Sequence, residues 1–225
     1  MNIYFDNAAT TPIDPEVIAA MIPVLETNFG NPSSIHRDGR EARSIIEKAR
    51  KRIAAHFNAS PAEFFFTSGG TEADNMILRC AVEELGVTQI ITSPIEHHAV
   101  LHTAEEIQKH RNVTLNLVKV DEKGKVDIKH LKELLQTKEK TLVSLMHANN
   151  EIATMISLEE IGALCKEHGA YFHSDTVQTM GHYAFDFQAL KMDFATCSAH
   201  KFNGPKGIGF IYISSEVKLK PFITG

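Results

Sequence analysis

The sequence predicts an α/β protein with three α/β/α layers, in which helices cover both faces of a mostly parallel β-sheet. Two observations support this fold class. Short apolar runs of strand length alternate along the chain with segments whose apolar residues recur every three or four positions, as in amphipathic helices. Polar clusters follow most of the apolar runs, at the strand ends where open α/β sheets bind ligands.

Composition limits what the chain can be. With 225 residues, 43% hydrophobic and 23% charged, it is expected to be a soluble globular protein with one large domain. The net charge of -5 and the lack of a long basic run argue against nucleic acid as a partner. No apolar segment has the length of a membrane span, and residues 1–6 do not resemble a signal peptide, so no membrane association and a cytoplasmic location are expected.

The first 57 residues predict an arm and two helices. Residues 1–14 are expected to form an N-terminal arm, with an extended piece over 3–5 and a polar turn over 6–12. Asp14 and Pro15 supply an N-cap and a first-turn proline for a helix ending near Glu26. A loop over 28–34 is equally consistent with a linker and with a ligand contact. The apolar spacing over 37–57 predicts a long amphipathic helix.

The rest of the chain, residues 15–225, is expected to be one large domain without repeats or linkers. An aromatic strand over 64–67 leads through two glycines into a helix that ends near residue 85. Further strands are predicted over 89–93, 113–120, 141–146, 170–174, 193–196 and 209–213, and further helices over 99–109, 128–135 and 158–168.

The glycine turn and the next strand end carry the first chemical signals. Gly70 and Thr71 would place free backbone N–H groups and a hydroxyl at a helix start, which suits a phosphate, although glycines also simply make turns. The phosphate-loop lysine and the dinucleotide spacing are both lacking, so a molecule smaller than a nucleotide is favoured. His97 could stack on a ring or move protons. His98 and His102 are four apart but lack a third ligand, so no metal is expected.

Three later strand ends complete the pattern. Asn150 supplies an amide, although Asn-Asn pairs are also common in turns. Asp175, with Gln178 three residues on, ends a buried strand and needs a cation such as a protonated ring nitrogen. Lys201, in the sequence Ser198-Ala199-His200-Lys201, is either a solvated lysine or a covalent anchor. Pyridoxal 5'-phosphate requires this combination of a phosphate cradle, an acid at its ring nitrogen and a lysine at its aldehyde.

These motifs together resemble the cysteine desulfurases of iron–sulfur cluster assembly, which are class V aminotransferase-type enzymes with the type I pyridoxal-phosphate fold. The segments that carry the resemblance span nearly the whole chain: 6–11, 30–36, 67–75, 96–100, 149–152, 174–178 and 198–201. The resemblance implies that residues 15–225 are the cofactor-binding large domain of that fold. It also implies an L-cysteine desulfurase reaction that leaves L-alanine and passes sulfur on as a persulfide, in a homodimer that meets an iron–sulfur scaffold or another sulfur acceptor.

The resemblance also assigns roles by position. Lys201 would be the Schiff-base lysine and Asp175 the partner of the ring nitrogen. Asn150 and Gln178 would bond the phenolic-oxygen side of the ring, and His97 would stack on the ring and move protons. Gly70, Thr71, Ser198 and His200 would hold the phosphate. Ala199 completes the expected cofactor-binding set.

The sequence departs from the family pattern at two points. It stops at Gly225, before the C-terminal small domain with its sulfur-accepting cysteine and substrate-binding arginine, so the chain alone is not expected to turn over cysteine. Ala153 stands where a glycine is usual, and we expect this change to be tolerated. The three cysteines are expected to be reduced packing residues rather than nucleophiles: Cys80, Cys165 and Cys197.

Two alternatives remain open at this point. The cofactor residues do not fix the substrate, so another class V enzyme, an aminotransferase or a selenocysteine lyase, would carry the same motifs. A dimeric fragment without catalytic activity that binds a sulfur-acceptor scaffold would also retain the fold.

Overall fold

The computed structural model describes residues 3–223, so the outermost residues of the predicted arm and of the predicted domain lie outside the described part. Its centre is a seven-stranded sheet in the order β1-β7-β6-β5-β4-β2-β3. The strands are β1 (Phe64–Thr67), β2 (Gln89–Thr92), β3 (Thr114–Leu117), β4 (Thr141–Ser144), β5 (Tyr171–Asp175), β6 (Phe194–Ser198) and β7 (Gly209–Ile213).

Strand direction confirms the mostly parallel sheet. The pairs β2–β3, β2–β4, β4–β5 and β5–β6 are parallel, whereas β7 runs antiparallel to both β1 and β6. The reversal of β7 was not predicted, and it follows from the short connection after β6, which has no room for a crossover helix. Because β1 and β6 both oppose β7, the carboxyl ends of β1, β2, β4, β5 and β6 lie at one edge of the sheet.

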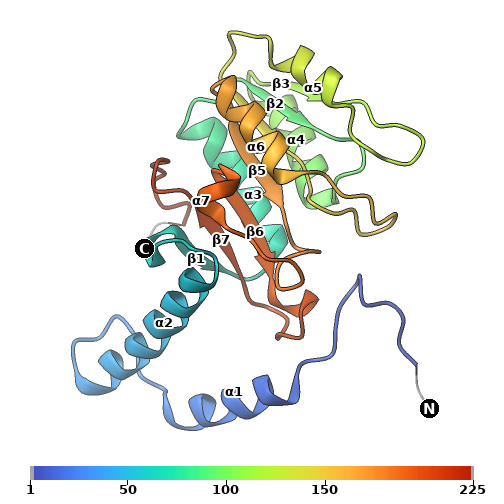
Figure 1. The fold of residues 1–225 in the computed structure, drawn as a ribbon. Coiled ribbons are helices and arrows are strands. Elements are labelled where there is room, and N and C mark those ends of the chain that lie inside the picture. Colours follow the sequence, from blue (N-terminus) through green and yellow to red (C-terminus); the bar gives the residue numbers. More distant parts are fainter. Residues whose placement is uncertain (1–2, 224–225) are drawn as a thin grey trace.

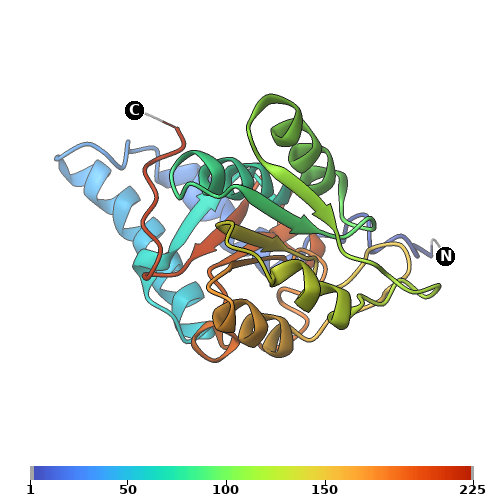
Figure 2. The same cartoon turned by 90° about the horizontal axis from the view of Figure 1, so that it is seen from above.

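Helices cover the two faces of the sheet, as predicted (Figure 2). The core on one face contains α3 (Gly70–Glu83) and α4 (His98–His110), which pack on the apolar side chains of β2, β4, β6 and β7. The core on the other face contains α5 (Ile128–Leu135), α6 (Leu158–Glu167), α7 (Phe187–Leu190) and the end of α2 (Arg37–His56). Alternating strand residues point into each core: Leu142 faces one and Val143 the other.

The N-terminal helices extend away from the sheet (Figure 1). The first of them is α1 (Pro15–Thr27), and it begins as predicted, with the Asp14 carboxylate accepting from the Glu16 N–H at 2.7 Å and Pro15 at the first helical position. It buries none of its side chains. Within residues 3–223, no helix is both long enough and apolar enough to cross a membrane.

Three short helical turns were not predicted: η1 (Pro61–Glu63), α7 and η2 (Ala199–Lys201). Each is only three or four residues long, too short for an apolar repeat to show. The predicted strand over 113–120 was too long, because only Thr114–Leu117 pairs with β2. The remaining predicted helices and strands differ from the structure by at most three residues at either end.

Candidate active site

The edge formed by the strand ends holds a cavity of about 440 Å³. Nine of the ten residues predicted to bind a cofactor line it: Gly70, Thr71, His97, Asn150, Asp175, Gln178, Ser198, His200 and Lys201. Ala199 does not line it; its carbonyl accepts from the Gly204 N–H at 2.9 Å and so holds the following turn. The remaining lining residues were not singled out from the sequence: Asp6, Ala8, Ala9, Asp74, Met146, Glu151 and Val177.

The β1–α3 turn brings a helix start against the cavity. The first N–H groups of α3 lack acceptors within the helix and are free for an anion. Gly70 is required there by close approach, because a Cβ on this residue would lie 2.7 Å from Cγ2 of Val177. A phosphate group therefore fits this corner, between the helix start and the side chains of Ser198 and His200.

Asp175 is the last residue of β5 and is only 5% exposed. Its Oδ1 accepts from the Val177 N–H at 2.9 Å and from the Thr196 hydroxyl at 3.4 Å. Burial raises the pKa of Asp175, and the Val177 N–H, His97 and Lys201 oppose this rise. A carboxylate placed this way can stabilise a protonated ring nitrogen entering the cavity, because the incoming charge would offset its desolvation.

Lys201 follows β6 in the turn η2 and is partly buried. Its Nζ donates to the carbonyl of Ala9 at 3.0 Å and to that of Ala8. Burial lowers the pKa of Lys201, while Asp175 and Asp6 act in the opposite direction. A lowered pKa increases the fraction of neutral amine, which is the form that attacks an aldehyde.

The N-terminal arm covers the lysine side of the cavity, which the sequence did not reveal. Thr11 anchors it: the Thr11 hydroxyl donates to the His200 carbonyl at 2.9 Å and accepts from the Asn203 N–H at 2.7 Å. The Gln178 amide donates to the Ala8 carbonyl at 3.0 Å. The predicted polar turn is present, since the Ala9 N–H donates to the Asp6 carbonyl at 3.1 Å, and its residues form a wall of the cavity.

His97 is the N-cap of α4, and its Nδ1 accepts from the Ala99 N–H at 3.1 Å. This bond leaves Nε2 as the ring atom that can carry a proton. The preceding residue, Glu96, is buried and ties this loop to the end of β4 by accepting from the Ser93 hydroxyl at 2.6 Å and from the Met146 N–H at 2.9 Å. Burial raises the pKa of Glu96 to about 8.

Asn150 follows β4 at the cavity wall, and its amide donates to the Glu151 carboxylate at 2.6 Å. The turn that carries it is held by Asn149, whose amide donates to the Ile95 carbonyl at 2.7 Å. Ala153 closes this turn with φ 59°, a left-handed conformation that favours glycine. Alanine at this position therefore carries backbone strain that a glycine would not.

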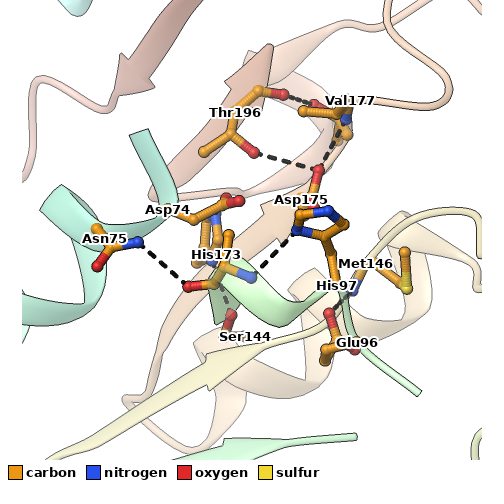
Figure 3. A network of polar contacts seen from close by, with 12 residues as sticks. Asp74, Asn75, Glu96, His97, Ser144, Met146, His173, Asp175, Val177 and Thr196 are labelled. Carbon is orange, nitrogen blue, oxygen red and sulfur yellow. Dashed lines mark hydrogen bonds and ion pairs between the residues drawn. The ribbon is translucent and has the colours of Figure 1, made fainter. Parts of the chain in front are cut away.

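Asp74 is a cavity residue that the sequence reasoning missed. It lies on α3 four residues after Gly70, and this spacing, which puts both on one helix face, was the available signal. Figure 3 shows it beside His173 and Asp175. Burial and the neighbouring Asp175 raise the pKa of Asp74 well above its usual value.

Two other features bear on what the site can do. The rings of His98 and His102 stack with centroids 4.5 Å apart, and the described part of the chain holds no group of three possible metal ligands. All three cysteines are free and buried, as expected: Cys80 in α3, Cys165 in α6 and Cys197 in β6.

Known proteins and solved structures resemble this chain over nearly its whole length. A family model described as "Aminotransferase class-V" matches residues 3–225. The chain is 47% identical to "Putative cysteine desulfurase IscS 1" of Bacillus subtilis (strain 168), covering 99% of this chain and 59% of that protein. A solved structure described as "NIFS-LIKE PROTEIN" is 41% identical with a TM-score of 0.95, covering all of this chain and 62% of the other.

A further solved structure, described as "SspA in complex with cysteine", is 32% identical with a TM-score of 0.93. The match covers all of this chain and 65% of the other. This chain therefore spans about 60% of the length of these relatives.

Proposed function

The chain belongs to the class V aminotransferase family, and we propose that it forms the cofactor-binding part of a pyridoxal-phosphate-dependent cysteine desulfurase. The observation that carries this proposal is the convergence of Lys201, Asp175 and Gly70 on one cavity, at three strand ends that are far apart in the sequence. A lysine, a buried acid and a free helix start match the aldehyde, ring nitrogen and phosphate of this cofactor.

Each side chain receives a role from its position. Lys201 provides the amine for the aldehyde, and Asp175 holds the ring nitrogen. Gly70, Thr71, Ser198 and His200 hold the phosphate; Asn150 and Gln178 bond the phenolic-oxygen side. His97 lies against the ring and moves protons through Nε2. When bound, pyridoxal phosphate supplies an aldehyde that condenses with amines and a ring that accepts the electron pair left by the α-proton.

The substrate proposed is L-cysteine, converted to L-alanine with the sulfur passed on as a persulfide. The similarity to proteins named as cysteine desulfurases, and to a structure described as containing cysteine, supports this choice over an aminotransferase or a selenocysteine lyase. The proposal extends to a homodimer in the cytoplasm that delivers sulfur to iron–sulfur cluster assembly.

The test is covalent capture of the cofactor. The protein incubated with pyridoxal phosphate should become yellow, and borohydride reduction should fix the cofactor on the peptide that contains Lys201, as read by mass spectrometry. Lys201→Ala should abolish the label, whereas Lys218→Ala, at an exposed lysine that does not line the cavity, should retain it. A label that persists in Lys201→Ala would show that another lysine is the anchor.

A second measurement separates the desulfurase from an aminotransferase. Adding L-cysteine to the protein as it occurs at full length should release L-alanine without any oxo acid present. Release of the amino group only when an oxo acid is supplied would favour the aminotransferase instead.

A further inference from the structure

A second buried carboxylate lies behind Asp175. The Asp74 side chain is 2% exposed, and its Oδ1 lies 3.5 Å from Nε2 of His173, whose side chain is 0% exposed. The structure gives neither of these two atoms a hydrogen-bond partner within residues 3–223. On the other side of the ring, His173 Nδ1 is 2.8 Å from the Ser144 hydroxyl. Figure 3 shows the three side chains in a row behind Asp175.

A single proton between Asp74 and His173 would satisfy both orphaned atoms, since a buried polar atom without a partner is costly. Burial lowers the pKa of His173 to about 3, so the imidazole is neutral. A protonated Asp74 can then donate to Nε2, and the Nδ1–H can donate to Ser144. In this arrangement both orphaned atoms have a partner.

The surroundings decide which of the two carboxyl groups is protonated. Asp74 faces two other acids, Asp175 and Glu96, both of which raise its pKa, and the Thr196 hydroxyl is the one group that lowers it. Asp175 faces the cationic side of the cavity, where His97 and Lys201 lower its pKa. Two like charges buried side by side do not both ionise readily, so the ionised member is the one nearer the cations.

We propose that Asp74 is a positioning residue: it holds the proton of the carboxyl pair on the side of His173, and so keeps Asp175 ionised toward the cavity. This inference rests on the proposed function, because an ionised Asp175 matters only if a protonated ring nitrogen meets it. Nothing in it requires Asp74 to touch the cofactor.

The proton acceptor can be removed with His173→Phe. Without Nε2, the proton of the carboxyl pair would be shared more evenly between Asp74 and Asp175, the acid that raises the pKa of Asp74 most, and Asp175 would be partly neutralised. A rise of one unit in the pKa of Asp175 corresponds to about tenfold in an equilibrium constant. Pyridoxal phosphate should therefore bind at least about tenfold more weakly to His173→Phe than to the parent protein. The double variant His173→Phe/Asp74→Asn should bind pyridoxal phosphate with an affinity within about threefold of that of Asp74→Asn alone. The reason is that the amide introduced by Asp74→Asn can donate a hydrogen bond to Asp175 but cannot give up its proton.

The cofactor-free protein provides an independent readout. With ¹³C-carboxyl-labelled aspartate, the Asp74 signal, assigned by its loss in Asp74→Asn, should have the chemical shift of a protonated carboxyl at pH 7, and the Asp175 signal that of a carboxylate. In His173→Phe the Asp175 signal should move toward the protonated position. Ser144→Ala should move it in the same direction, because without the hydroxyl the ring favours the Nε2–H tautomer, which cannot accept from Asp74. This variant serves if His173→Phe does not fold.

Two results would overturn the inference: an ionised Asp74 at pH 7 in the cofactor-free protein, or a double variant that binds the cofactor no better than His173→Phe. A purely structural role predicts additive losses in the double variant, with no recovery. If no form of the protein binds pyridoxal phosphate, the proposed function fails, while the carboxyl signals still decide the protonation of Asp74.

Discussion

Gly70→Ala tests the close approach between the start of α3 and the turn that follows β5. The new Cβ would lie 2.7 Å from Cγ2 of Val177 and 4.0 Å from Cβ of Ser198. The Val177 methyl belongs to a β-branched side chain with few rotamers, so it yields only if the turn that carries it moves.

Two effects of opposite sign determine how much Gly70→Ala changes the free energy of unfolding. Alanine in place of glycine in a helix gains up to about 1 kcal/mol from propensity, and less at the first helical position. Overpacking of this kind costs about 1–3 kcal/mol. The clash therefore wins, and we expect Gly70→Ala to lower the free energy of unfolding by about 1 kcal/mol. Because it displaces Val177 next to Asp175, it should also weaken cofactor binding.

The control removes the contacting methyl. In a Val177→Ala background the same Gly70→Ala change should be neutral or stabilising, since only the propensity gain remains. Urea denaturation monitored by circular dichroism gives the free energies, and absorbance titration with pyridoxal phosphate gives the affinities. A Gly70→Ala variant that is more stable than the parent, with Val177 intact, would refute the close-contact reasoning.

Three further predictions concern strain, burial and pH. Ala153→Gly should raise the free energy of unfolding by about 0.5 kcal/mol in urea denaturation, because relief of the left-handed strain exceeds the entropy cost of glycine; a loss of stability would contradict this. Cys80, Cys165 and Cys197 should not react with a thiol reagent until the protein is denatured, because burial raises the pKa of all three; rapid labelling of the native protein would show that one is accessible. Burial raises the pKa of Glu96 from 4.5 to about 8. Between these two pH values the folded state keeps a proton that the unfolded state releases, so the free energy of unfolding of the parent protein should fall as the pH rises. Glu96→Gln should remove this loss of stability, which is at most about 1.4 kcal/mol per pH unit. If the parent and Glu96→Gln show the same dependence of the free energy of unfolding on pH, the prediction is wrong.

The parts of the fold that the sequence predicted are those that depend on local pattern. The apolar spacing of α2 and the Asp14-Pro15 start of α1 are properties of neighbouring residues, so they could be recognised without tertiary structure. The position of β7 between β1 and β6 could not be, because only the sheet order shows it. Its reversed direction had a local signal that was not used, the short connection after β6. The turn η2 was not recognisable either, because three residues are too few for an apolar repeat to show.

The residues of the candidate site fall into the same two groups: those that local sequence reveals and those that only the tertiary structure reveals. Lys201 and Asp175 were recognisable because each belongs to a polar cluster that follows or closes a predicted strand. The covering of the lysine by the carbonyl of Ala9 was not, because backbone carbonyls leave no trace in a sequence and the two residues are 192 positions apart. Asp74 was passed over because an aspartate within a helix looks the same in a sequence whether its side chain is exposed or buried, and most are exposed. Only the structure shows that its side chain is buried against a second acid.

The distribution of perturbed groups supports the location of the site on physical grounds alone. Asp74, Glu96 and Asp175 are buried acids with raised pKa values, and His173 is a buried base with a strongly lowered one. All four lie around the same edge of the sheet, although they come from α3, the loop after β2, and β5. Burying ionisable groups destabilises a fold, and a protein that served only to pack a core would use apolar side chains here. Two of the four, Asp74 and Asp175, line the cavity together with Lys201. A buried pair of acids with raised pKa values marks a candidate functional site on physical grounds alone.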